Sequence, residues 1–469
     1  MRFLLPAAAV VLLSAQAWAA DPALLARFDK TLEEIRRSHF EYTGGTTFVE
    51  DARLRHGVYT TFGGYAIDDE LGHTRILRQL DSKLWFQGQR HGHSVYGRIR
   101  FRYQDFNSGD EFAGTSSGLV YPLGDRYWYR FDWQADRRAE EGEDTTWNWW
   151  VQVGRQYVEW VTGLVMSDTL YAVRFGFEAS LFTVEGMLAI TPDSIVDIDS
   201  SRTGFTTDTE RHIWAISVEY AGWSGHQPFA YILGQTDEND AVQPGGLRHG
   251  YDSTYVSVGS TGQIVTGEWL YRIEGVYQFG RSTSDLLGAF PQTIDDIAAW
   301  AGRILLAFNP ARLRDTRGLR IELEILIGSG DDDRLSSAQA SGGNLSGTED
   351  ESFNAFGYVN TGHALAPSLA NLLAVRIGAT AIPFRENPRL ARLRVGIDVF
   401  YYAKTDDNAP LSTTTTAGQS YVGIGVDLAA TWQVTSDFVI DVRYGIFIPG
   451  DAVTGSELHF GYLGISYGF

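Results

Sequence analysis

The sequence contains no cysteine among its 469 residues. It can therefore form neither a disulfide bond nor a thiolate metal site, and covalent c-type haem attachment is excluded. Lysine is nearly absent as well, because Lys30, Lys83 and Lys404 leave arginine to supply the rest of the 38 basic residues. No segment approaches the roughly 18 continuous apolar residues that a membrane-spanning helix needs. If this chain crosses a membrane, it must do so with strands.

Catalytic motifs are missing too. The sequence has no Walker loop, no His-Glu-x-x-His pair and no nucleophile elbow. Its 10 histidines are scattered, and no Ser/His/Asp set can be aligned. We therefore expect no enzyme activity and no cofactor. The net charge of −20, from 38 basic and 58 acidic residues, disfavours nucleic acid as a partner.

The first residues have the form of a secretory signal. Arg2 supplies a positive charge, Phe3 to Leu13 form a short apolar stretch, and Ala17-Trp18-Ala19 is a small-x-small cleavage site. We predict a signal peptide over residues 1–19. An N-terminal periplasmic segment follows over 20–56, in which Asp21 to His39 has the spacing of a short amphipathic helix.

The rest of the chain, residues 57–469, is dominated by two-residue alternation. One set, Val95, Gly97, Ile99, Phe101 and Tyr103, alternates with Tyr96, Arg98, Arg100 and Arg102. Leu463, Ile465, Tyr467 and the terminal Phe469 alternate in the same way. A soluble sandwich would show this pattern too. The signal sequence, an aromatic content of 13% and the final aromatic strand instead favour an outer-membrane barrel surrounded by lipid and lipopolysaccharide.

The spacing of the alternating segments predicts an all-β, transmembrane antiparallel barrel of about eighteen strands, because single-chain bacterial barrels have even strand numbers. Long connections alternate with tight turns such as Gln89 to Gly92, so both termini are expected on the periplasmic side. The predicted strands are 57–67, 75–87, 93–106, 126–137, 145–154, 169–178, 180–190, 210–221, 227–236, 250–260, 266–280, 294–308, 318–328, 369–382, 392–404, 419–432, 437–447 and 456–469.

The long loops are acidic, which concentrates negative charge on the outer rim. The ordinary explanation is solubility and divalent-ion bridging to lipopolysaccharide. Asp331, Asp332 and Asp333 are a weak candidate for a calcium-ordered loop, although the twelve-residue spacing of a regular calcium loop is absent.

Parity also predicts which side chains line the lumen of such a barrel, which would be wide enough for an aqueous channel. The predicted pore-lining residues are Arg98, Arg100, Arg102, Arg130, Arg174, Arg272, Arg303, Arg320, Arg376, Arg394, Arg443, Asp132, Glu322, Glu324 and Asp398. They could form an internal salt-bridge lattice that stiffens the barrel. They could also form an anion path, in which successive arginines on one strand, Arg98, Arg100 and Arg102, pass a polyanion along the pore axis.

Several short stretches lie near predicted strand ends: Val153-Gly-Arg-Gln156, Asp168 to Phe175, Ser329-Gly-Asp-Asp332, Phe353 to Tyr358 and Tyr444 to Asp451. In their order and placement the chain resembles the bacterial alginate-export porin family. The resemblance implies an eighteen-strand barrel, a narrow electropositive pore, a polyuronate cargo and a periplasmic partner that delivers it. Arg155 shares the parity of outward Trp147 and Trp149, so we expect it at the base of a loop.

The preferred hypothesis is a passive exporter of an anionic exopolysaccharide. Its expected partners are that polysaccharide, outer-membrane lipid and lipopolysaccharide, and periplasmic export proteins. A diffusion porin for small anions or sugars is the first alternative, and inward Trp128 and Trp150 are aromatic candidates for the sugar version. The second alternative is a structural barrel that scaffolds a partner protein.

Overall fold

The structure is a computed structural model. It describes residues 28, 30, 32, 33, 36, 37, 39–41, 45–49, 52–70, 72–112, 115–120, 124–193, 195–198, 209–239, 248–284, 292–310, 318–334 and 343–469. The predicted signal peptide over residues 1–19 lies outside this described part, and the proposed boundary at residue 57 between the N-terminal segment and the barrel stays a prediction.

One antiparallel sheet contains all the described strands. They are β1 (Gly45–Val49), β2 (Ala52–Asp68), β3 (Thr74–Arg90), β4 (His93–Phe106), β5 (Gly118–Val120), β6 (Gly124–Asp132), β7 (Trp147–Glu159), β8 (Ser167–Ala179), β9 (Phe182–Ile190), β10 (Arg211–Tyr220), β11 (His226–Asp237), β12 (Tyr251–Val265), β13 (Trp269–Thr283), β14 (Ile294–Phe308), β15 (Arg320–Gly328), β16 (Leu372–Ala381), β17 (Leu393–Lys404), β18 (Tyr421–Gln433), β19 (Phe438–Pro449) and β20 (Leu458–Gly468). The short β1 and β5 pair only with β2 and β4.

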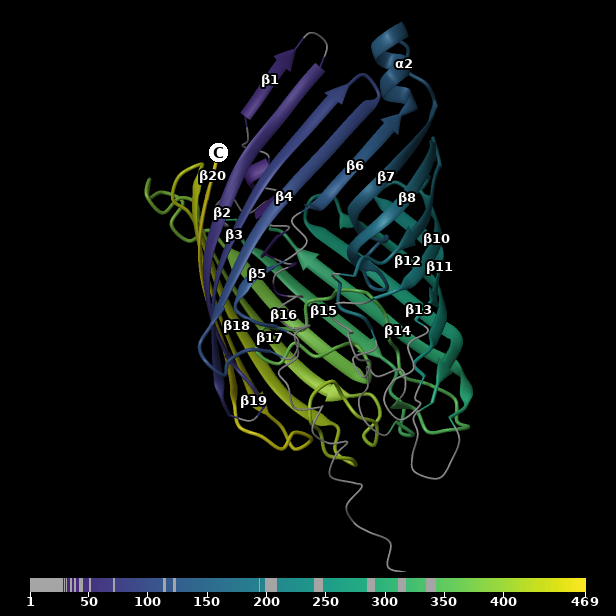
Figure 1. Cartoon of the computed structure of the whole chain (residues 1–469), viewed down its shortest axis with the longest axis vertical. Helices are drawn as coiled ribbons and strands as arrows, with labels where there is room; N and C mark the ends of the chain where they lie inside the picture. The colour runs from purple at the N-terminus through teal and green to yellow at the C-terminus, as the bar shows by residue number, and fades with distance from the viewer. Residues whose placement is uncertain are drawn as a thin grey trace, which may run out of the picture.

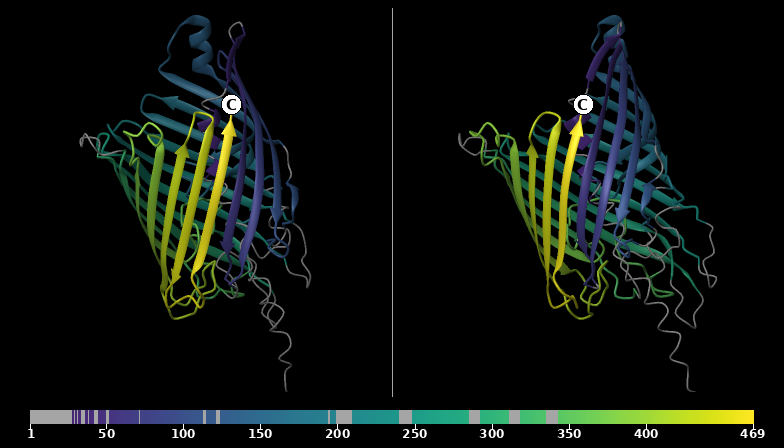
Figure 2. Two further views of the ribbon diagram at one scale, coloured as in Figure 1. Left: turned by 90° about the vertical axis from the view of Figure 1, so that its left-hand side faces the viewer. Right: turned by 60° about the vertical axis from the view of Figure 1, so that its left-hand side comes forward.

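The other eighteen strands close into a barrel, which confirms the predicted fold class. The seam joins β2 to β20, with Tyr59 opposite Gly468 and Ile67 opposite Phe460. Val58 and Phe469 exchange two backbone hydrogen bonds of 2.9 Å beyond the last paired residue. Figure 2 shows this seam as the contact between the last yellow strand and the purple strand beside it. Closure leaves no edge strand whose backbone would be unpaired in lipid.

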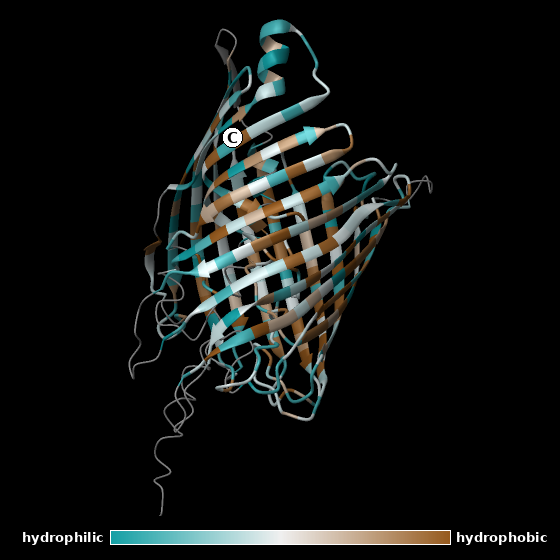
Figure 3. Cartoon of the chain, turned by 90° about the vertical axis from the view of Figure 1, so that its right-hand side faces the viewer, coloured by the Kyte–Doolittle hydropathy of each residue, from teal (hydrophilic) through white to brown (hydrophobic). Residues whose placement is uncertain are grey.

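Hydrophobic residues alternate with more hydrophilic ones along the strands (Figure 3). Successive side chains of a strand point to opposite faces of the sheet, so the apolar set covers the outer face. Exposed Leu188, Val258 and Ile377 are examples. The predicted outward set on β4 is also exposed, at 43% for Ile99, 47% for Phe101 and 50% for Tyr103. Among the described residues, no helix has the length and apolar character needed to cross a bilayer.

The two ends of the barrel differ. Tight connections, such as the turn between β3 and β4, lie at the end that holds the C-terminus (Figure 1). The other end carries the long connections, including residues 329–371 between β15 and β16. Short turns mark the periplasmic end of outer-membrane barrels, so we call these the periplasmic and the extracellular end.

One predicted strand, 126–137, is wrong in its second half. β6 ends at Asp132 and the helix α2 (Trp133–Glu141) follows at the periplasmic end. The Asp132 side chain accepts a hydrogen bond of 3.1 Å from the backbone N–H of Ala135, and Gly142 ends the helix with a φ of 70°. An N-capping aspartate and a left-handed glycine outweigh the alternation that suggested a strand.

The described residues between positions 28 and 41 are helical, and we call them the inner helix. These residues belong to the predicted N-terminal periplasmic segment, and their described side chains contact the inner face of the barrel. Phe28 packs edge-on against Tyr462, with ring centroids 5.2 Å apart, and Phe40 stacks on Tyr59 at 5.4 Å. The apolar face of the helix is therefore covered by aromatic side chains of β2 and β20 rather than left in water.

Candidate functional site in the barrel lumen

The three successive arginines of β4 alternate with the exposed Ile99 and Phe101, and carboxylates accompany each of them. Arg98 is buried and its Nη2 lies 2.6 Å from Asp125. Arg100 donates to Asp81 at 2.6 Å, and Arg102 lies 3.5 Å from the same carboxylate. The ladder is thus part of a charged network and is not a row of bare cations.

The inner helix completes this network. Glu33 lies 2.6 Å from Nη1 of Arg98, forms an ion pair with Lys83, and accepts a hydrogen bond of 3.3 Å from Tyr59. Burial alone would raise the pKa of the Glu33 carboxyl, but Lys83 and Arg98 outweigh burial and hold this pKa well below its ordinary value. Glu33 is therefore ionised at neutral pH.

A second network lies across the barrel on β14 to β17. Arg376 contacts three carboxylates, Glu322, Glu324 and Asp398, each at 2.8 Å. Arg303 shares Glu324 at 2.6 Å. Arg320 donates to Glu322 at 2.5 Å. These inward residues form the internal salt-bridge lattice that was one of the two interpretations of the sequence.

A third group lies on β6 to β9. The Arg130 guanidinium stacks over Trp150 at 4.2 Å, and Arg174 lies 5.7 Å from the same ring while pairing with Glu185. Trp150 is therefore covered by two cations. Trp128, the other aromatic candidate for sugar contact, stacks on Tyr96 at 5.5 Å. Asp132, predicted as a pore-lining residue, caps α2 at the periplasmic rim and lies 3.4 Å from Arg130.

The remaining predicted arginines have fewer or more distant carboxylate partners among the described residues. Arg443 lies 3.4 Å from Asp441 and donates to Thr431 at 3.1 Å. Arg272 and Arg394 have no carboxylate at ion-pair distance among the described residues, and Arg394 is exposed near the periplasmic end of β17. Cationic groups without a fixed partner are the ones that an incoming anion can bind at the lowest cost.

The lumen is open in its periplasmic half and filled in its extracellular half. On β12 the inward Tyr251, Ser253 and Tyr255 are buried, whereas Thr261, nearer the periplasmic end, is half-buried. The same change occurs on β10, where Arg211 is buried and Glu219 is half-buried. Arg130, Arg320 and Arg394 lie in the periplasmic half, and their side chains are more exposed than those of Arg100 and Arg102, which lie farther along β4.

The filling of the extracellular half comes from connections that fold inward. Phe353 and Phe356 of the β15–β16 connection are buried in a cluster with Leu164 from the β7–β8 connection. The backbone N–H of Ser167 donates to Phe356 at 3.0 Å, and that of Tyr358 donates to Gly163 at 3.0 Å. We call residues 343–371 the inner loop, because these contacts hold it inside the barrel.

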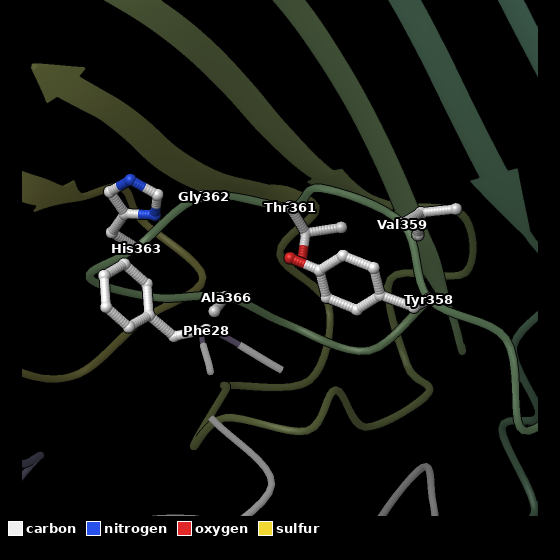
Figure 4. Close-up of a pocket in the computed structure, with 7 residues that line it drawn as sticks. All are labelled: Phe28, Tyr358, Val359, Thr361, Gly362, His363 and Ala366. Carbon is white, nitrogen blue, oxygen red and sulfur yellow. The ribbon is translucent and has the colours of Figure 1, made fainter. Parts of the chain in front are cut away.

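The inner loop and the inner helix meet at one place, shown in Figure 4. Phe28 lies directly beside His363, with ring centroids 5.3 Å apart and planes at 85°. Tyr358, Thr361 and Ala366 line the rest of this small pocket. The two segments that narrow the lumen therefore support each other.

Sequence reasoning missed Asp81, Lys83, Asp125 and Glu33 as parts of the site. Parity could have found two of them, because Asp81 and Lys83 alternate with outward Leu80 and Leu84 on β3. Asp125 lies at an irregular start of β6, where the register with β4 shifts after Arg98. Nothing in the local pattern of Glu33 indicated that its helix would enter the barrel.

Two further predictions concerned loops. Arg155 lies within β7, so its expected place at the base of a loop is wrong. It pairs in register with Tyr127 and Tyr171, both exposed on the outer face, and donates to the Asp125 backbone oxygen at 3.0 Å, so it does not line the lumen. Asp331 uses its oxygens to accept backbone N–H bonds from Asp333 and Glu351. Carboxylate oxygens of Asp331, Asp332 and Asp333 do lie within 4.8 Å of one another, but a calcium site there stays a prediction.

Comparison with solved structures finds outer-membrane porins of the same fold. A BenF-like porin from Pseudomonas fluorescens Pf-5 is 10% identical with a TM-score of 0.54, covering 90% of this chain and 100% of the porin. OccAB1 of Acinetobacter baumannii is 11% identical with a TM-score of 0.53, covering 90% and 97%. OpdK of Pseudomonas aeruginosa, solved with vanillate, is 10% identical with a TM-score of 0.51, covering 90% and 100%.

A comparison with curated protein sequences found no match. A protein-family model described as "Alginate export" matches residues 147–459, which is more than half of the chain. Its match begins at β7 and ends in β20, so it covers most of the barrel wall and the inner loop. Together with the porin-like fold, this match shows that the chain belongs to the alginate export family of the bacterial outer membrane.

Proposed function

We propose that this chain is a passive channel that moves an anionic polysaccharide of uronic acids from the periplasm to the cell exterior, without a catalytic step. One observation carries the proposal: Arg130, Arg320 and Arg394, which are more exposed than the arginines in the middle of β4, lie in the periplasmic half of the lumen, where a polymer arriving from inside the cell would enter. Arg130 is 31% exposed and Arg320 is 40% exposed in their side chains. The family membership supports the same cargo class.

The ion-pair lattice suits transport better than tight binding. Guanidinium groups bind carboxylates strongly when both partners are free. Here Glu322 and Glu185 stay within reach of Arg320 and Arg174, so they compete with each cargo carboxylate. Conduction requires binding that is favourable enough to admit the cargo and weak enough to release it. We also propose that periplasmic proteins of the export machinery deliver the polymer to this mouth.

The test has two measurements on the full chain: oligosaccharide binding to the protein refolded in detergent, and ionic current through the protein in planar bilayers. A fluorescent oligouronate should bind, a neutral oligosaccharide of equal length should not, and the affinity should fall with salt. The double variant Arg320→Gln with Arg394→Gln should weaken binding by roughly tenfold, if each lost contact is worth about 0.7 kcal/mol. Arg389→Gln, an exposed arginine in the periplasmic turn after β16, is the matched control.

Other outcomes would favour the alternatives. Binding of small carboxylates alone, with no preference for oligomers, would indicate a diffusion porin; vanillate, the ligand named for OpdK, is the type of probe to use. Binding of neutral and acidic oligosaccharides with equal affinity would contradict an arginine-dependent path. An absence of both binding and current would favour a barrel that scaffolds a partner protein.

A further inference from the structure

The inner wall beside the inner helix carries an excess of positive charge that the helix itself reduces. Five wall cations gather there: Lys83, Arg98, Arg100, Arg102 and Arg126. Among the described residues, the wall supplies the carboxylates of Asp81 and Asp125 for them. Within this described part of the wall, the cations outnumber the carboxylates in a confined space, which is costly unless an anion enters.

Glu33 supplies such an anion. Its two oxygens are divided between Arg98, at 2.6 Å, and Lys83, and Tyr59 donates a third contact at 3.3 Å. The side chains of Arg98 and Lys83 are only 1% and 2% exposed with Glu33 in place. This geometry, with one carboxylate bound by a guanidinium, an ammonium and a phenol, is a general way to bind any carboxylate.

We propose that Lys83, Arg98 and Tyr59 form a carboxylate-binding site for the polyuronate cargo, which Glu33 occupies until the cargo displaces it. The inference rests on the proposed function for the identity of the competing anion. A polyuronate carries one carboxylate per sugar, so a polymer already held at the periplasmic arginines presents further carboxylates to this site at high effective concentration. Displacement of Glu33 then removes the inner helix from the path of the polymer.

Other residues also hold the inner helix against the wall, among them buried Leu32 and Arg36, which donates to the Tyr462 hydroxyl. Lys30 pairs with Asp168 at 2.6 Å, and the Lys30 side chain is 27% exposed. Glu41 accepts a hydrogen bond of 2.6 Å from Tyr96 and lies 3.7 Å from Arg98. Phe28 and Phe40 add the aromatic contacts described above. Glu33 is the one described residue of the helix that reaches two wall cations, so its charge is the contact that a polyanion can replace directly.

The absence of cysteine allows a direct test, because one introduced thiol labels a single position. Arg37→Cys places a nitroxide label on the inner helix at a side chain that is 39% exposed. In the full-length protein refolded in micelles, an oligouronate should convert the immobile spectrum to a mobile one, and a neutral oligosaccharide should leave it immobile. Adding Glu33→Gln should mobilise the label without ligand and strengthen oligouronate binding by roughly tenfold to a hundredfold, the range that one charge-assisted hydrogen bond corresponds to.

Two variants serve as controls. Glu41→Gln makes the same charge change on the same helix at a carboxyl that contacts fewer wall cations, and Glu111→Gln makes it in an exposed extracellular loop. Both should leave the affinity within about threefold of the parent. If the oligouronate binds but neither mobilises the label nor gains affinity from Glu33→Gln, the displacement model is wrong while the export proposal stands. If no variant binds the oligouronate, both fail together.

Discussion

Gly357 of the inner loop lies so close to Leu164 that a Cβ atom on the glycine would approach the Leu164 carbonyl oxygen to 1.8 Å. The contact joins two connections that are far apart in sequence, and it leaves room only for glycine. It lies beside the bridge between Met166 and Phe356, within the cluster that fills the extracellular half of the lumen.

Gly357→Ala is therefore expected to separate the inner loop from the β7–β8 connection and to open the lumen. Single-channel recording should show a higher conductance or a higher open probability than the parent. Gly275→Ala on β13 is the matched control, because a Cβ there meets no atom within 4 Å. Equal conductance for parent and Gly357→Ala would mean that the inner loop does not limit the current.

Asp81 balances three cations of the β3–β4 network with one buried carboxylate. Its Oδ2 lies 2.6 Å from Arg100, 3.1 Å from Lys83 and 3.5 Å from Arg102. Asp81→Asn should lower the free energy of unfolding by about 3–5 kcal/mol, as expected when one partner of a buried ion pair is removed. The measurement is a urea unfolding curve in micelles, in which the unfolded fraction is read from the slower migration of the unfolded barrel on a gel.

Asp105→Asn tests whether burial, rather than charge, sets this cost. Asp105 pairs with Arg78 at 3.1 Å, but both side chains are about half exposed, at 49% and 47%. Its removal should change the free energy of unfolding by less than about 1 kcal/mol. A similar loss from both substitutions would contradict the burial argument.

His363 should make the inner helix sensitive to acid. Burial, with the nearby Arg443, lowers the pKa of its imidazole from 6.5 to about 4. Because the folded pKa lies below the unfolded value, its stabilising contribution is complete above pH 6.5 and is lost as the pH falls toward 4, with a maximum of about 3 kcal/mol. The protection factors of the inner helix, which correct each exchange rate for its intrinsic pH dependence, should fall from pH 6.5 to pH 4, and His363→Gln should remove this fall.

Asp331 should act in the opposite direction at the extracellular end. Burial and the neighbouring Asp350 raise the pKa of its carboxyl to about 6, although Arg334 lowers it. A carboxyl whose folded pKa is raised contributes stability below its unfolded pKa of about 4, and this is lost as the pH rises through 6. The protection factors around residues 329–334, corrected for the intrinsic pH dependence of exchange, should therefore fall from pH 4 to 6 in the parent and stay constant in Asp331→Asn.

Periodicity predicted the barrel wall well, because the side of the wall on which a side chain lies depends only on strand parity. Ile99 and Arg98 are assigned to opposite faces by counting, and the structure agrees. The same counting misread Trp133 to Asp136, where the capping Asp132 begins a helix. Strand parity also could not predict that the inner helix and the inner loop lie inside the barrel. The positions of Glu33 and Phe356 depend on contacts across more than fifty positions of sequence, so no short pattern contains them.

The seam between β2 and β20 is a very non-local pairing, because Tyr59 and Gly468 lie opposite each other although nearly the whole chain separates them. Contacts of such long sequence separation slow folding. Until this pairing forms, the sheet has two open edges and an apolar outer face, a state prone to wrong pairing. A membrane surface or partner that shields those edges should therefore raise the yield of closed barrel.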